Sequence, residues 1–360
     1  MKLLVFAHTP PPHHGQSFMV AQLLAGLGGT PGLELHHVNA RLSRDAADIG
    51  HARPGKLLAL GRHVAEARRL QREHGLDTLY YVPAPGKRGA LLRDWIVMAA
   101  LRPRLPRLVL HWHAAGLGTW LQDRATPPER ALSRRLLGRA DLAVVLAETL
   151  RADGEALSAR RIAVVPNGIP DPCPGLVRKS RPDPALLHAL FVGLGSEAKG
   201  LLDAVRAVAL AGPGVRLTFA GEFADAAVAG EFARLAQPLG GRVQAAGFVQ
   251  GEAKQRLFAA ADVLLLPTRY PHEAQPLVVL EALAHDLPVV STAWRGIPAT
   301  LPGAEQRFVE AGRPDQMAAQ LARLQAQPPA AGARRAHFLS HLTTAHHLAA
   351  LDAALRSLDP

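Results

Sequence analysis

The sequence predicts an α/β protein built from two doubly wound, parallel-sheet domains. Its 360 residues exceed the usual size of a single hydrophobic core, so we expect two domains. Short β-branched and Leu-rich runs alternate with longer amphipathic stretches, which is the pattern of parallel strands covered by helices. Six prolines within the 19 residues from Pro166 to Pro184 interrupt this alternation and indicate a linker between two series of strands.

The first series of strands begins at the start of the chain. Each run is short, apolar and followed by turn-forming or polar residues. The expected strands are Lys2–Ala7, Leu33–Val38, Thr78–Val82, Arg107–His111, Leu142–Leu146 and Ile162–Val165. Helical patterns lie between them, among them Lys56–Glu73 and Arg130–Arg139.

The second series follows the proline-rich stretch. Its expected strands are Ala189–Val192, Val215–Ala220, Val243–Ala245, Val263–Leu266 and Pro288–Ser291. Helical patterns cover Gly200–Leu210 and Lys254–Ala260, and the tail from about Arg334 to Leu358 predicts one or two more helices. Ligands of such domains bind outside the carboxyl ends of the parallel strands.

Composition excludes several classes of protein. Hydrophobic residues make up 48% of the chain, which argues against disorder. The longest apolar runs, such as Trp95 to Leu101, are far shorter than the roughly 18 residues that span a bilayer. Leu3 to Ala7 is interpreted as a buried strand, with a signal peptide as the minor alternative. Cys173 is the only cysteine, so no intramolecular disulfide and no thiolate metal cage can form, and we expect a cytoplasmic protein.

The net charge of +11 lies entirely in the first half of the chain. Residues 1–180 contain 25 Lys or Arg and 14 Asp or Glu, whereas residues 181–360 contain 16 of each. The basic half has no zinc-ligand spacing, helix-turn-helix pattern or interleaved aromatics, so we expect no nucleic-acid partner. An anionic membrane surface or a phosphorylated acceptor fits the positive charge. The alternative is that the charge reflects only an Arg-rich amino-acid composition typical of the source.

The strongest chemical signal is the stretch from Val263 to Thr292. A buried strand leads into Thr268, a polar loop follows, and a helix begins near Pro276 or Leu277. Glu273 precedes that helix and Glu281 lies within it. A carboxylate can accept hydrogen bonds from two neighbouring hydroxyls of a sugar, and the first amides of a helix bind phosphate. By its spacing alone, the stretch is better interpreted as an ordinary strand, loop and helix with two surface glutamates.

This stretch resembles the signature of the family 4 retaining glycosyltransferases, in which Pro-Ser/Thr and a loop precede two glutamates separated by seven residues. The sequence Glu273-Ala-Gln-Pro-Leu277 is similar to members that build polysaccharides and lipopolysaccharides. Arg295-Gly-Ile-Pro298 continues the resemblance, although Ala299 stands where an acidic residue is expected. The resemblance implies the GT-B fold, with two Rossmann-like domains facing each other across a cleft.

The resemblance also implies a division of the chain. Residues 1–166 would form the acceptor domain, joined by a helix of about residues 340–360 that crosses back. Residues 167–179 would be the linker, and residues 180–335 the nucleotide-sugar domain.

Roles for individual residues follow from the same resemblance. Lys199 would neutralise the donor diphosphate, His113 would contact the donor sugar, and Glu273 would complete the catalytic set. The alternative for Lys199 is a solvated lysine, and the alternative for His113 is a histidine of the hydrophobic core. A core position is favoured for the neighbouring His111. The expected donor-binding residues are Gly15, Lys199, Val249, Thr268, Gln275, Pro276, Leu277 and Glu281, with a plain turn as the alternative at Gly15.

The implied reaction is metal-independent transfer of a sugar, with retention, from a nucleotide-diphosphate sugar to a glycan or lipid-linked acceptor. We expect no cofactor and no metal ligands, and a location in the cytoplasm or at the inner face of the plasma membrane. Leu194 replaces an arginine usual in the family. That departure is the one feature that favours a non-catalytic nucleotide-sugar-binding protein. A sugar-nucleotide epimerase or a sugar phosphorylase of the same fold is a further alternative.

Overall fold

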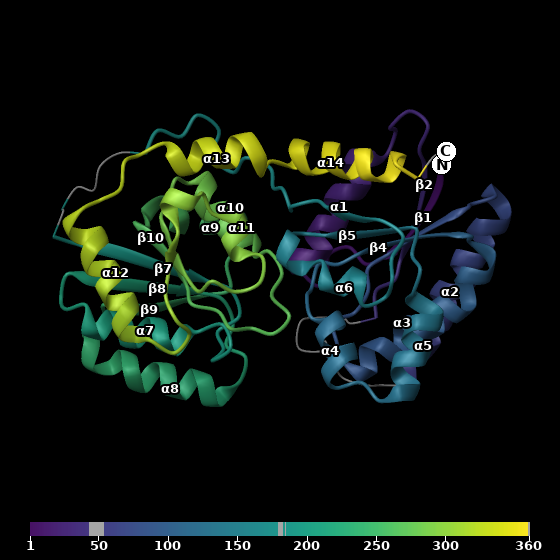
Figure 1. Cartoon of the computed structure of the whole chain (residues 1–360). Helices are drawn as coiled ribbons and strands as arrows, with labels where there is room; N and C mark the ends of the chain where they lie inside the picture. The colour runs from purple at the N-terminus through teal and green to yellow at the C-terminus, as the bar shows by residue number, and fades with distance from the viewer. Residues whose placement is uncertain (43–53, 179–182, 184, 359–360) are drawn as a thin grey trace. The chain divides into compact units, whose positions relative to one another are not determined.

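The computed structural model describes residues 1–42, 54–178, 183 and 185–358 (Figure 1). The end of the predicted linker and the first residues of the predicted second domain, at 179–182 and 184, lie outside the described residues. The chain divides into two compact units. The first comprises Met1–Asn167 and Thr344–Pro360, and the second comprises Gly168–Thr343.

The first unit contains a six-stranded parallel sheet in the order β2-β1-β3-β4-β5-β6 within the described residues. Its strands are β1 (Lys2–Ala7), β2 (Glu34–Asn39), β3 (Thr78–Tyr81), β4 (Arg107–His111), β5 (Leu142–Val145) and β6 (Ile162–Val164). Its helices are α1 (Gly15–Leu27), α2 (Pro54–His74), α3 (Arg88–Leu101), α4 (Leu117–Asp123), α5 (Pro127–Leu137), α6 (Ala152–Glu155) and α14 (Thr344–Arg356).

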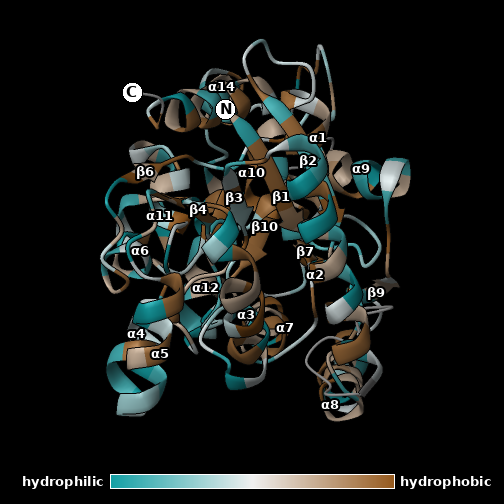
Figure 2. Cartoon of the chain, turned by 90° about the vertical axis from the view of Figure 1, so that its right-hand side faces the viewer, coloured by the Kyte–Doolittle hydropathy of each residue, from teal (hydrophilic) through white to brown (hydrophobic). Residues whose placement is uncertain are grey.

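The core of the first unit follows from the two-residue period of its strands. Leu3 and Val5 of β1 lie in one apolar cluster with Val20 and Leu23 of α1 and Leu351 of α14. The C-terminal helix α14 is therefore part of the first unit, where it packs against α1 (Figure 1). Figure 2 shows β1 and β4 as hydrophobic, brown ribbons, as expected for strands buried on both faces of a parallel sheet.

The second unit contains another six-stranded parallel sheet, in the order β12-β11-β10-β7-β8-β9 within the described residues. Its strands are β7 (Leu187–Val192), β8 (Val215–Ala220), β9 (Val243–Gly247), β10 (Val263–Leu266), β11 (Val289–Ser291) and β12 (Arg307–Phe308). Its helices are α7 (Leu201–Leu210), α8 (Ala226–Ala236), α9 (Gly251–Ala260), α10 (Leu277–Ala284), α11 (Ile297–Thr300), α12 (Pro314–Ala326) and α13 (Ala333–His341).

The central strand β7 separates two apolar layers. Ala189 and Phe191 pack in the cluster formed with α7, α8 and α12, whereas Leu190 and Val192 pack in the cluster formed with α9, α10 and α13. The predicted α/β architecture with two parallel sheets is confirmed, and strands β1, β4, β8 and β10 have the predicted bounds. Strand β12 was not predicted, because two residues carry no periodic pattern.

Strand order locates the ligand edge of each sheet. In the second unit β7 is the first strand in sequence; β8 and β9 continue to one side of it and β10, β11 and β12 to the other. The order therefore reverses between β7 and β10, and the same reversal occurs between β1 and β3 in the first unit. Ligands of open α/β sheets bind outside the carboxyl ends of the strands at such a point.

Candidate donor site

Two loops meet at the carboxyl ends of β7 and β10. Gly200 lies in the left-handed region with φ +80, and a Cβ atom on it would be 2.5 Å from the carbonyl oxygen of Pro267. Only glycine allows the turn after β7 to approach the loop after β10 this closely. The amide of Arg269 donates to the carbonyl of Ala198 at 2.7 Å and ties the two loops together. Backbone packing thus brings Lys199 to the loop that carries Thr268 and Glu273.

Lys199 and Glu273 form an ion pair at this point. The Lys199 Nζ atom donates to Oε2 of Glu273 at 2.6 Å, and the Thr268 hydroxyl donates to the same oxygen at 3.2 Å. The ammonium group also lies 5.0 Å from the centroid of the Tyr270 ring. The side chains of Lys199 and Glu273 are 19% and 8% exposed, so the pair is largely withdrawn from water. The interpretation of Lys199 as a solvated lysine is therefore wrong.

A second ion pair holds Glu281 in helix α10. The Lys254 Nζ atom, from α9, donates to Oε1 of Glu281 at 2.7 Å, and the Glu281 side chain is 13% exposed. The Oε2 atom of Glu281 is buried and has no hydrogen-bond partner. Burial raises the pKa of this carboxyl, and the Lys254 ammonium opposes the increase. The alternative of two surface glutamates is wrong, because both carboxylates are largely buried and paired with lysine.

The first turn of α10 lies between the two glutamates in sequence. Helix geometry leaves the amides of Leu277 and Val278 without an acceptor inside the helix. Pro276, the N-cap residue, has no N–H and cannot donate to a phosphate. A phosphate at this helix end would therefore be bound by the amides of Leu277 and Val278. Gln275 is buried, and its side-chain amide donates to the Thr300 hydroxyl at 3.1 Å. This hydrogen bond ties the loop before α10 to helix α11.

Val249 lies in the loop between β9 and α9 and is partly buried against the apolar cluster of α10. Of the predicted site residues, Lys199, Thr268 and Glu273 are in direct contact. Pro276 and Leu277 begin helix α10, and Glu281 lies one turn further along it. Gln275 precedes this helix, and Val249 packs against its apolar cluster. Sequence analysis did not predict Lys254 as a site residue. Its partner Glu281 lies 27 positions further along the chain, and no sequence pattern indicates a contact over that separation.

The two remaining predicted residues lie in the first unit, at the carboxyl ends of its strands. Gly15 is the first residue of α1, directly after the N-cap His14, whose Nδ1 accepts from the Ser17 amide at 3.3 Å. His113 follows β4; its Nδ1 atom is buried without a hydrogen-bond partner. His111 is fully buried beside the Tyr80 hydroxyl, in agreement with the core alternative for that residue.

Six histidines of the first unit have pKa values lowered mainly by burial: His8, His14, His37, His111, His113 and His347. The pKa of His113 falls to about 3, since burial and the nearby His347 and His14 all disfavour its charge. The pKa of His8, whose Nε2 lies 2.8 Å from Nε2 of His14, falls to about 4. At neutral pH these rings are uncharged. His113 can therefore form a hydrogen bond with a hydroxyl group as a neutral imidazole.

The two sheets and their strand-order reversals define the GT-B class of fold, and comparison with solved structures agrees. Sucrose-phosphate synthase from Thermosynechococcus elongatus has a TM-score of 0.77 at 18% identity, over 99% of this chain and 99% of that chain. HepE from Anabaena, crystallised with UDP, has a TM-score of 0.71 at 17% identity, over 99% and 100%. The lipopolysaccharide outer core galactosyltransferase WaaB has a TM-score of 0.72 at 14% identity, over 99% of each chain.

More particularly, residues 187–327 match the model of the family described as Glycosyl transferases group 1. This stretch contains both lysine–glutamate pairs and the first turn of α10. A sequence comparison with curated proteins finds no match.

Proposed function

We propose that this chain is a retaining glycosyltransferase that transfers a sugar from a nucleotide-diphosphate sugar to a glycan or lipid-linked acceptor. The observation that carries the proposal is the Lys199–Glu273 pair at the strand-order reversal of the second sheet. A cation, a carboxylate and two free helix amides are the groups that a sugar diphosphate requires. The match of residues 187–327 to a glycosyltransferase family supports the same assignment.

Each group has a distinct partner on the donor. Lys199 and the amides of Leu277 and Val278 hold the diphosphate, since both carry positive or partially positive charge. Glu273 accepts hydrogen bonds from hydroxyls of the transferred sugar. Glu281, with one oxygen on Lys254 and the other unpartnered, accepts from the ribose.

The proposed chemical step is the one that the family resemblance implies. The bond between the sugar C1 and the β-phosphate oxygen breaks while the acceptor oxygen bonds to C1 on the same face. The departing phosphate oxygen takes the proton of the acceptor hydroxyl, so no separate carboxylate base is required. Lys199 stabilises the charge that develops on the diphosphate, and this is where a preorganised cation contributes most to rate.

Transfer is proposed to need no divalent metal, because Lys199 and the helix amides neutralise the diphosphate. Activity should therefore persist in excess EDTA. Complete loss on chelation, restored by magnesium or manganese, would contradict this assignment of the diphosphate contacts.

The test of the proposed function begins with the donor. UDP-, GDP-, ADP- and CMP-sugars are screened by thermal shift, because a ligand that binds only the folded state raises the Tm. A single-turnover assay with the stabilising donor then measures sugar transfer or hydrolysis. No stabilisation by any nucleotide sugar would refute the donor site. Stabilisation without any turnover in the presence of candidate acceptors would identify a binding protein, the reading that Leu194 favours.

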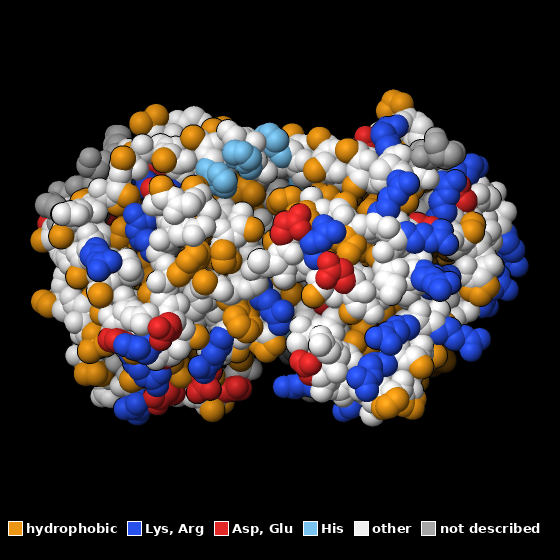
Figure 3. Space-filling view, viewed as in Figure 1, with side chains coloured by type: hydrophobic (Ala, Val, Ile, Leu, Met, Phe, Trp, Pro, Cys, Tyr) orange, Lys and Arg blue, Asp and Glu red, His pale blue; other side chains and the backbone are white. Residues whose placement is uncertain are grey.

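A lipid-linked acceptor would place the first unit at an anionic membrane. None of the helices in the described residues is both long and apolar enough to cross a bilayer. Adjacent helices α2 and α3 nevertheless expose large apolar side chains, with Leu57 60%, Leu58 70% and Leu92 51% exposed. Figure 3 shows many Lys and Arg side chains on the right-hand side of the view, the side on which α2 and α3 lie in Figure 1. Each basic residue near an anionic surface contributes about 1 kcal/mol.

Co-sedimentation with vesicles tests this placement. Vesicles containing anionic lipid should retain the protein at low salt and release it at high salt, because exposed charges are screened. Equal binding to neutral and anionic vesicles, or no binding to either, would show that the surplus of basic residues does not bind the protein to anionic membranes.

A further inference from the structure

A cluster of three potential metal ligands lies on the first unit, separate from the residues assigned to the donor. Glu34 and His36 belong to the edge strand β2, and His74 is the last residue of α2. One ligand atom from each of the three side chains lies within 4.8 Å of the others. No other group of three His, Cys, Asp or Glu in the described part of the chain meets this condition.

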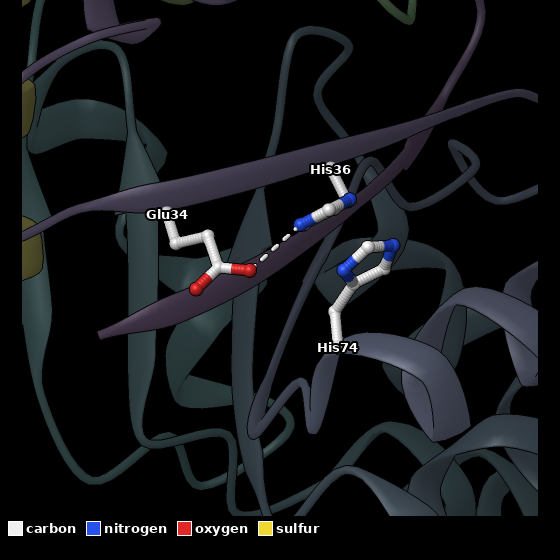
Figure 4. Close-up of side chains that lie close together, drawn as sticks. All are labelled: Glu34, His36 and His74. Atoms are coloured by element: carbon white, nitrogen blue, oxygen red, sulfur yellow. Dashed lines mark hydrogen bonds and ion pairs between the residues drawn. The ribbon is translucent and has the colours of Figure 1, made fainter.

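The fold places the three side chains together for simple reasons. Glu34 and His36 are two residues apart on a strand, so both project from the same face of the sheet. Helix α2 packs along β2 and ends with the His74 ring stacked on His36, with ring centroids 3.9 Å apart and an interplanar angle of 28°. His36 Nε2 lies 2.9 Å from Oε1 of Glu34 (Figure 4). Two rigid elements therefore supply the ligands.

The dimensions suit a small transition-metal ion after a modest side-chain adjustment. A tetrahedral zinc ion with Zn–N distances of about 2.0–2.1 Å requires ligand atoms about 3.3 Å apart. The ligand atoms now lie within 4.8 Å of one another, and the two imidazoles are partly exposed, so binding would require their side chains to rotate towards the ion. Two imidazoles and one carboxylate select zinc over magnesium or calcium, which prefer oxygen ligands.

The charges around the cluster determine how strongly a cation is held. The Lys2 ammonium lies 3.2 Å from Oε2 of Glu34 and donates to the carbonyl of His74 at 2.8 Å. It therefore occupies one carboxylate oxygen and leaves Oε1 on the side of His36.

We propose that Glu34, His36 and His74 form a zinc-binding site, with a water molecule as the fourth ligand on the exposed side. The ion would join the edge strand β2 to the end of α2 and so stabilise the first unit. This role is independent of sugar transfer, for which no metal is proposed.

Isothermal titration of the untagged, metal-free protein with Zn²⁺ at pH 7.5 tests the proposal. We expect one tight binding event per chain and an increase in Tm with Zn²⁺ concentration. His36→Ala combined with His74→Ala should abolish the tight event, and Glu34→Gln should weaken it. The Tm of each variant without metal shows whether the variant still folds.

The matched control is the pair His337 and His341 on α13, whose stacked rings have centroids 4.7 Å apart. Replacing both by alanine should leave the tight event unchanged. The proposal is overturned if the wild type binds Zn²⁺ no more tightly than the His36/His74 variant. It is equally overturned if the His337/His341 variant loses the tight event while Glu34→Gln retains it in full.

Discussion

Replacement of Glu281 by glutamine tests the proposed ribose contact while preserving the shape of the side chain. The Glu281 Oε2 atom is buried and unpartnered, and Oε1 is held by Lys254 at 2.7 Å. A hydrogen bond to a charged group contributes about 1.5–3 kcal/mol, so losing the carboxylate should weaken nucleotide binding roughly 10- to 100-fold. Alanine would be a poorer probe, because it would also leave a cavity and an unpaired lysine.

Stability should change far less than affinity. The Lys254 side chain is 23% exposed, so its ammonium can reach water when Glu281 no longer carries a charge. The glutamine oxygen still accepts a hydrogen bond from it. We expect a change of about 1 kcal/mol or less in the free energy of unfolding.

The assay is titration calorimetry with the nucleotide identified by the thermal-shift screen. The matched control is Glu305→Gln, because Glu305 is also 13% exposed and is paired with Arg307 at 2.8 Å and Arg334 at 3.0 Å. An unchanged Kd for Glu281→Gln would refute the ribose contact. An equal loss for Glu305→Gln would show that the effect is a general one of removing a buried charge.

Three further predictions concern the cation, the close loop approach and the histidines. Lys199→Ala should lower kcat/KM by at least about 30-fold, equivalent to ~2 kcal/mol of lost transition-state stabilisation; a near-wild-type rate would direct attention to Arg269 or Arg295. Gly200→Ala should reduce stability by about 1–3 kcal/mol in chemical denaturation, because its Cβ would meet the Pro267 carbonyl at positive φ. Gly230→Ala, in an open position of α8, should be neutral or stabilising. The neutral, buried histidines bind protons more weakly than in the unfolded chain, so stability should fall as pH decreases from 6.5 towards the pKa of His8 at about 4; a slope unchanged in His8→Gln would contradict this.

Local patterns accounted for much of the fold. Buried runs such as Val263–Leu266 are recognisable because both faces of a parallel strand are apolar, and the bounds of β10 agree with the prediction. The helix that begins at Leu277 was also predicted, and Pro276 is its N-cap residue with an extended backbone. Strand β12 was missed because pairing with β11, rather than its own sequence, makes Arg307–Phe308 extended.

The sequence by itself determined the class of fold and the residue types of the candidate site, since helices, strands and short motifs depend on neighbours in the chain. Only the tertiary structure decided which of those residues meet. Lys199 and Glu273 are 74 positions apart, and their contact depends on Gly200 allowing one loop to approach another. Lys254 pairs with Glu281 because α9 and α10 share an apolar layer. Burial, and with it the change of two apparent surface glutamates into paired, largely buried carboxylates, is a property of packing between segments that no local pattern contains.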